Sequence, residues 1–240
     1  MRLSDAWEDV AAEWIRWARA PAHDTYWLFH RERFLELVPP PGELTLDVGC
    51  GEGRVSRDLQ ELGHRVISFD ASPTMLAGAR EADPEGDYRL ADAAALPLDD
   101  ACADLVVAFM SLQDVDDMPG AVCEIGRVLR PGGRACIAVV HPLNSAGKFE
   151  SDDDDSPFVI TGSYLDESRT VDLFERDGYR MTFHSAHHPL EAYSRPLEEA
   201  GLLVEAIREP KSATLDGRPA GRTNRWLRVP LFLHVRAVKP

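Results

Sequence analysis

The sequence predicts an α/β fold built on a doubly wound, mostly parallel sheet, and two observations lead to this prediction. Five short apolar segments (44–48, 65–70, 87–90, 104–110 and 134–140) alternate with amphipathic segments. The central apolar segments are hydrophobic throughout, which is typical of strands that helices cover on both faces. Right-handed crossovers between such strands then place helices on both sides of the sheet.

Caps and glycines mark the ends of the helices expected between these strands. Helices are predicted over 54–62, 72–82 and 118–129. Ser72 suits the N-cap of the second helix, because its hydroxyl can accept a bond from an open backbone amide. Pro73 suits the first turn, where no donor is needed. Gly63 ends the first helix, and the "RPGG" stretch ends the third.

The two ends of the chain follow other patterns. Helices are expected on either side of residues 20–24, before the first strand. The stretch from Pro142 to His188 is long for a loop, so it is predicted to carry structure of its own or to form a lid. A helix ending at Gly201 follows, in which Pro196 is expected to produce a kink or a split. Two strands close the chain.

These elements are predicted to form a single domain over residues 1–240, which is long enough to bury a substantial core. The N-terminal helices make a helical cap over 1–40, and the core covers 41–142. A lid insertion covers 143–188, and the C-terminal helix with its two strands covers 189–240.

Composition limits the kinds of partner. The net charge of −15 argues against nucleic acid as a partner, because phosphate contacts need a basic face. No apolar run is long enough to span a membrane, and the N-terminus lacks a secretory apolar core, so a cytoplasmic protein is expected. The four cysteines are not spaced as metal ligands, so no metal is expected. The acidic run 150–156 is interpreted as a solvated loop.

The stretch "LTLDVGCGEGRVS", at 44–56, is a strand followed by a glycine-rich turn and a helix. A dinucleotide fingerprint has the pattern G-x-G-x-x-G, whereas here the third glycine, Gly53, comes one residue early. Asp47 ends the strand two residues before Gly49, at the sheet edge where ligands bind. A carboxylate there repels a pyrophosphate and attracts an ammonium group.

The ends of the following strands supply groups suited to an adenosine. Asp70 can accept both hydroxyls of a ribose, and Asp92 can accept an adenine amino group beside the Ala93 backbone. Met110 can pack against the adenine or the ribose. An adenosine that carries a cationic amino-acid tail is S-adenosylmethionine, which is the predicted cofactor.

With these motifs the sequence resembles the class I S-adenosylmethionine-dependent methyltransferases of the bacterial small-molecule type. The matching stretches are "LDVGCGEG", "VISFDASPTML", "LADAAALPLDDACADLVVAFMSLQDVDD" and "EIGRVLRPGGRACIAVVHP". The resemblance implies a Rossmann-like seven-stranded sheet of order 3-2-1-4-5-7-6 with the last strand antiparallel. Asp70 stands where the family often has Glu. The cofactor residues it implies are Asp47, Gly49, Cys50, Gly51, Gly53, Asp70, Ala71, Met75, Asp92, Ala93 and Met110.

Aromatic and histidine side chains are candidates for the remaining roles. Tyr26 can cover the cofactor's sulfonium, since aromatic faces attract cations, or it can be core packing. His141 follows the fifth strand directly, while His184 and His187 flank the predicted lid. Each can take a proton from an acceptor near neutral pH, and each is as readily interpreted as a packed or surface histidine.

The expected function is methyl transfer from S-adenosylmethionine to a small-molecule acceptor, at oxygen, by in-line displacement with histidine as a possible base. A small-molecule substrate is expected, without nucleic acid or membrane, and no oligomeric state is predicted. One alternative is a protein that binds S-adenosylmethionine without catalysis. The other is a nicotinamide-dependent oxidoreductase, against which Asp47 and the displaced third glycine count.

Overall fold

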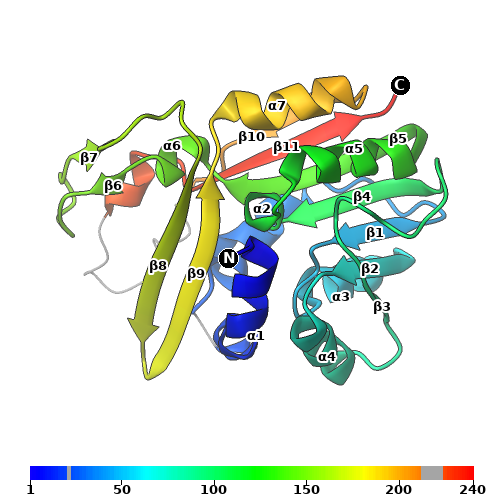
Figure 1. Ribbon diagram of the computed structural model, residues 1–240, viewed down its shortest axis with the longest axis horizontal. Coiled ribbons are helices and arrows are strands. Elements are labelled where there is room, and N and C mark those ends of the chain that lie inside the picture. Colours follow the sequence, from blue (N-terminus) through cyan, green and yellow to red (C-terminus); the bar gives the residue numbers. More distant parts are fainter. Residues whose placement is uncertain (21–22, 212–223) are drawn as a thin grey trace.

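A seven-stranded sheet forms the centre of the computed structural model, which describes residues 1–20, 23–211 and 224–240 (Figure 1). Neighbouring strands in the sheet are β3 (Asp87–Leu90), β2 (Val66–Asp70), β1 (Thr45–Val48), β4 (Ala103–Phe109), β5 (Leu129–Val140), β11 (Phe232–Val238) and β10 (Leu203–Arg208). The strands from β3 to β5 are parallel, and β11 is antiparallel to both β5 and β10. The predicted antiparallel last strand is therefore confirmed.

The strand order differs in detail from the expected 3-2-1-4-5-7-6. Four strands outside the sheet separate β5 from β10 along the chain, so the observed order is 3-2-1-4-5-11-10. These four strands lie within the stretch from Pro142 to His188, where the sequence no longer alternates between strands and helices. The connection that follows β10 lies largely at 212–223, outside the described residues.

Helices cover both faces of the sheet, as a doubly wound fold requires. On one face, α5 (Met118–Val128) and α7 (Leu190–Glu199) bury Ile125 and Leu197 against the apolar residues of β4 and β5. On the other face, η1 (Tyr26–His30), α2 (Arg31–Leu35) and α3 (Arg54–Glu61) bury Phe34 and Leu59. Helix α7 continues through the buried Pro196, so the predicted split is wrong.

Helix α1 (Leu3–Arg19) lies against three separate parts of the molecule. Its first amides, at Leu3 and Ser4, donate to the Asp116 carboxylate after β4. Glu8 accepts from the Thr74 hydroxyl at 2.6 Å, at the start of α4 (Pro73–Ala82). The Trp7 indole donates to the backbone oxygen of His184 at 2.8 Å. These contacts hold the N-terminal helix beside the carboxyl ends of the central strands.

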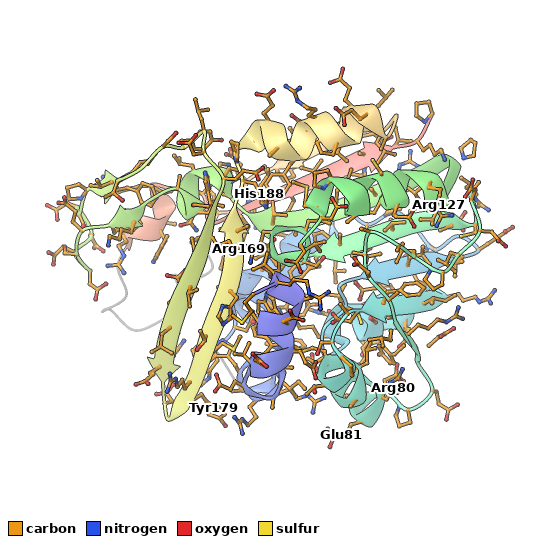
Figure 2. The ribbon with its side chains drawn as sticks, in the orientation of Figure 1. Arg80, Glu81, Arg127, Arg169, Tyr179 and His188 are labelled. Atoms are coloured by element: carbon orange, nitrogen blue, oxygen red, sulfur yellow. The ribbon has the colours of Figure 1, made fainter. Side chains whose placement is uncertain are left out.

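The region after β5 contains a short helix, a small ribbon and a long hairpin. They are α6 (Pro142–Ser145), β6 (Lys148–Phe149) with β7 (Phe158–Val159), and β8 (Ser168–Arg176) with β9 (Tyr179–His187). The hairpin turns at Asp177 and Gly178, both with positive φ, which matches the right-handed twist of paired strands. Figure 2 labels Tyr179 at the tip of the hairpin and His188 at its other end, below α7.

Two short helical turns complete the described chain, η2 (Leu112–Asp114) after β4 and η4 (Asn224–Leu227) before β11. Among the described residues, we find no helix with the length and apolar character needed to cross a bilayer. The acidic run is largely exposed, and Asp152 pairs with Arg225 at 2.5 Å.

Candidate functional site

A large cavity opens at the carboxyl ends of β1, β2 and β4. Its volume is about 2130 Å³, and its walls include the glycine turn after β1, helix α1 and the β8–β9 hairpin. A pocket for one small ligand usually measures roughly 300–1,000 Å³. The cavity therefore has room for a cofactor and a second molecule. Most of the predicted cofactor residues line it, namely Asp47, Gly49, Cys50, Gly51, Asp70, Ala71, Met75, Asp92, Ala93 and Met110.

The glycine turn depends on backbone conformations that glycine adopts without strain. Gly49, Gly51 and Gly53 have φ of +73°, +56° and +82°. A Cβ on Gly49 would lie 2.3 Å from the Cβ of Ser111, so a side chain there would collide with the loop after β4. Gly53 is the N-cap of α3 and does not line the cavity, so it shapes the turn rather than the ligand surface.

Two carboxylates lie beside this turn, the buried Asp47 and the half-buried Asp70. Asp47 accepts a hydrogen bond from the Ser56 hydroxyl at 2.6 Å, and burial raises its pKa to about 7. Asp70 accepts from the amides of Gly51 at 2.7 Å and Ser72 at 2.9 Å, while burial raises its pKa. Neither carboxylate forms an ion pair with any residue that the structure describes.

Buried acids without cationic partners are suited to a ligand that supplies positive charge and hydrogen-bond donors. An ammonium group would favour the ionised form of Asp47, and ribose hydroxyls are donors that the Asp70 carboxylate can accept. The residues at this end of the cavity thus fit the amino-acid and ribose parts of S-adenosylmethionine.

The residues predicted to contact the adenosine differ from the two carboxylates in exposure and in backbone conformation. Asp92 is exposed, and its carboxylate accepts from the Ala94 amide at 2.9 Å. Met110 directly follows β4 and has φ of +55°, a left-handed conformation that is costly for a residue with a side chain. Strained residues of this kind gather at functional sites, and Met110 lines the cavity. Met75 lines it as well, although its side chain is almost fully buried.

Tyr26 lies behind the cavity wall rather than on it. Its ring is buried, and its hydroxyl donates to the Asp58 carboxylate. The Arg54 guanidinium lies 4.5 Å from the centre of the Tyr26 ring and 5.0 Å from that of Trp14. Trp14 and Arg54 line the cavity, whereas Tyr26 does not, so the geometry gives no support to Tyr26 as a cofactor contact.

The three predicted histidine bases also lie off the cavity. His141 uses Nδ1 to accept from the Leu143 amide at 3.0 Å, and its Nε2 lies 3.0 Å from a Glu209 oxygen. Burial lowers the pKa of His141, and Glu209 opposes that effect.

Both ring nitrogens of His187 are likewise occupied, by Ser145 Oγ at 2.6 Å and the Tyr164 carbonyl at 2.9 Å. His184 contributes its backbone oxygen to the Trp7 bond. None of the three histidines lines the cavity, and their role as a base remains a prediction that the geometry does not support.

The cavity has a second polar region that the sequence analysis did not select, formed by Gln113, Asp114 and Ser185. Asp114 follows β4 in η2, and Ser185 lies on β9. Burial raises the pKa of Asp114 to about 8, while hydrogen bonds from Ser185 and Gln113 act in the opposite direction. The signal in the sequence was the acid after the fourth strand, but only the hairpin fold brings Ser185 to it.

Comparison with known proteins gives the same assignment for the centre of the chain. Residues 46–137 match the sequence profile of a family described as "Methyltransferase domain". The crystal structure of an S-adenosylmethionine-dependent methyltransferase from Mesorhizobium loti superposes with a TM-score of 0.71 at 26% identity. That match covers 90% of this chain and 98% of the other.

Residues 46–137 belong to the methyltransferase domain family, and the relatives and the solved structures support a class I S-adenosylmethionine-dependent methyltransferase. A Mycolicibacterium smegmatis protein named "Probable S-adenosylmethionine-dependent methyltransferase" is 35% identical over 173 residues, which are 69% of this chain and 65% of that protein. S-adenosylmethionine is the cofactor of this methyltransferase family, in agreement with the buried acids and the glycine turn.

More specific relatives match the methyltransferase core only. A malonyl-[acyl-carrier protein] O-methyltransferase from Serratia marcescens is 43% identical over 93 residues, which are 39% of this chain and 36% of that protein. The chain thus covers well under half the length of the first curated relatives that it matches. The β8–β9 hairpin lies outside the matched family profile.

Proposed function

We propose that this protein transfers a methyl group from S-adenosylmethionine to an oxygen of a small-molecule acceptor. One observation carries the proposal: a single cavity joins the Asp47 and Asp70 carboxylates beside the glycine turn to a separate polar region at the β8–β9 hairpin. The first part fits the cofactor, and the volume leaves room for an acceptor next to it. The relatives named as O-methyltransferases favour oxygen as the receiving atom.

In this proposal the chain's own residues bind and orient the cofactor. Asp47 holds the ammonium group, Asp70 holds the ribose hydroxyls, and Gly49, Gly51 and Cys50 allow the backbone to come close. Asp92, Ala93, Ala71, Met75 and Met110 line the adenosine side. When bound, S-adenosylmethionine supplies a methyl group on a positively charged sulfur, which makes the methyl reactive toward a nucleophile without a metal ion.

The remaining segments would select the acceptor and exclude water. The helical cap (1–40) and the lid insertion (143–188) meet through the Trp7 bond to His184 and the edge-on contacts of Phe183 with Trp7 and Trp14. Phe183 and Trp14 line the cavity. A cap and a lid that join over the cavity favour a small acceptor rather than a nucleic acid, and the net charge of −15 agrees with this.

Binding measurements on the purified chain test the proposal. S-adenosylmethionine and S-adenosylhomocysteine should each raise the thermal midpoint, whereas NAD(H) should leave it unchanged. A shift with NAD(H) alone would support the oxidoreductase alternative. Binding should be followed by a screen for transfer of labelled methyl to alcohols, phenols, amines and carboxylic acids. Tight binding with no transfer to any of them would favour a protein that binds the cofactor without catalysis.

A further inference from the structure

The carboxylate of Asp114 lies in the cavity with one oxygen that has no hydrogen-bond donor. Its Oδ2 accepts from the side-chain amide of Gln113 at 3.1 Å, and Ser185 on β9 acts to lower the pKa of the carboxyl. Oδ1 is buried and has no partner among the residues that the structure describes. A buried carboxylate oxygen without a donor is costly, so this position is suited to a ligand that brings one.

The neighbouring Gln113 presents a second oxygen of the same kind. Its amide nitrogen donates to the Met110 carbonyl at 2.7 Å and to the Asp114 carboxylate. Because the Met110 carbonyl can only accept, the amide nitrogen must face it and the amide oxygen must face away. That oxygen, Oε1, is buried and also lacks a partner among the described residues. Gln113 Oε1 and Asp114 Oδ1 are therefore two neighbouring oxygens that can each accept a hydrogen bond from a ligand.

Among the residues that the structure describes, no charged group of the elements packed against this loop forms an ion pair with Asp114. On α5, Arg127 pairs with Glu124 and Asp100, and on β5, Arg134 pairs with Glu205. On the same loop, Asp116 pairs with Arg169. Strand β9 also carries His184 and His187, and His188 in the loop that follows it pairs with Glu167. On α7, Tyr193 is buried, and its pKa is raised by burial and by Asp114.

Resting on the proposed function, we infer that Asp114 is the base that takes the proton of the acceptor, and that the acceptor carries an O–H donor rather than a carboxylate. Asp114 Oδ1 accepts the hydrogen bond of the acceptor hydroxyl. The proton moves from the acceptor oxygen to Asp114, and the electron pair of the broken O–H bond stays on that oxygen, which forms the new bond to the methyl carbon. The bond between that carbon and sulfur breaks at the same time, and its electron pair goes to the sulfur, so the product that leaves is S-adenosylhomocysteine. Asp114 then returns its proton to water.

This arrangement separates the protein from its relatives that act on malonyl groups. A malonyl group ends in a carboxylate, which has no proton to donate at neutral pH. The oxygen of Gln113 and the ionised carboxylate of Asp114 would repel a carboxylate, and no Lys or Arg among the described residues bonds to either side chain. Burial raises the pKa of Asp114 to about 8, so this carboxyl is largely protonated at neutral pH and its ionised form, which accepts the proton, increases as the pH rises toward 8.

The test begins with the purified chain and carbon-13-labelled aspartate side chains, followed by NMR from pH 5 to pH 9. One carboxyl signal should titrate near pH 8 and disappear in Asp114→Asn. A second carboxyl signal should titrate near pH 7 and disappear in Asp47→Asn. When S-adenosylhomocysteine is added, the midpoint of the Asp47 signal should move to lower pH, whereas the midpoint of the Asp114 signal should stay raised. Asp166→Asn, an exposed acid before β8, is the control.

Methyl transfer to phenol, benzyl alcohol and malonyl-coenzyme A supplies the second readout. We expect transfer to the hydroxyl probes, lowered by roughly a hundredfold or more in Asp114→Asn with cofactor affinity unchanged, and loss of the limb near pH 8 in the pH–rate profile. An Asp114 carboxyl that titrates below pH 6 would overturn the inference. So would transfer to malonyl-coenzyme A that Asp114→Asn changes by less than threefold. Failure of the proposed function is separate, since it would appear as no binding of S-adenosylmethionine.

Discussion

At the scale of single residues, Asp70 connects the glycine turn to the start of α4. Its two oxygens accept from the amides of Gly51 and Ser72, so one carboxylate holds both segments in place. In the proposed complex it also accepts the ribose hydroxyls. A change at Asp70 should therefore weaken cofactor binding in two ways, by removing the ribose contact and by loosening the glycine turn that surrounds the cofactor.

We expect Asp70→Ala to weaken S-adenosylmethionine binding by about 1.5–3 kcal/mol, because charge-assisted bonds are lost. Isothermal titration calorimetry on the folded variant measures this, and circular dichroism verifies the fold. Asp99→Asn removes an exposed carboxylate from the loop after β3 and should bind like the unaltered chain. Unchanged affinity in a folded Asp70→Ala protein would remove Asp70 from the cofactor site.

At the scale of elements, the hairpin turn determines whether β8 and β9 stay paired beside α1. Gly178 has φ of +82°, and a Cβ there would meet nothing within 4 Å. Gly132, near the start of β5, has the same φ of +82° and equally open surroundings. Substituting alanine at either position introduces the same backbone strain without a collision, so the two glycines form a matched pair.

Gly178→Ala should destabilise the hairpin by about 1–2 kcal/mol, because a left-handed conformation costs that much once a Cβ is present. Amide hydrogen exchange of β8 and β9 should become roughly 5 to 30 times faster, since 1.4 kcal/mol is a factor of ten. Gly132→Ala should leave exchange in the hairpin unchanged. Equal acceleration in both variants would mean that the hairpin opens only with the whole molecule.

The sequence predicts some elements well because their signals are local. Apolar strands, the Ser72 cap and the glycine turn depend on neighbouring residues, and the sheet with its antiparallel last strand follows from them. The hairpin was missed although Asp177-Gly178 is a strong turn signal, because β8 is largely exposed and β9 has only two buried residues, Met181 and His187. Asp114 could not be selected for a related reason. Its importance depends on Ser185, which is distant in sequence and reaches it only through the folded hairpin.

At the scale of the whole molecule, two buried acids affect how stability depends on pH. Asp47 and Asp114 have folded-state pKa values of about 7 and 8, above the roughly 3.9 of an unfolded aspartate. Between these values the folded chain holds protons that the unfolded chain has lost. Stability from these groups is therefore fully present below about pH 4 and is lost as pH rises through 7 to 8. His30 and His234 act in the opposite direction, because burial lowers their pKa values.

Asp47→Asn isolates one of these acids, because the histidine contributions cancel when the variant is compared with the unaltered chain. We expect the unaltered chain to lose stability relative to Asp47→Asn by roughly 1–3 kcal/mol between pH 5 and pH 8, since each unit of pKa shift corresponds to 1.36 kcal/mol. Urea unfolding at the two pH values measures the difference. Saturating S-adenosylmethionine should reduce the loss in the unaltered chain, because its ammonium group stabilises the ionised carboxylate, and should do so much less in the variant. Parallel pH dependence of the two proteins, with and without the cofactor, would mean that Asp47 is ionised in the free protein and that its charge is already balanced there.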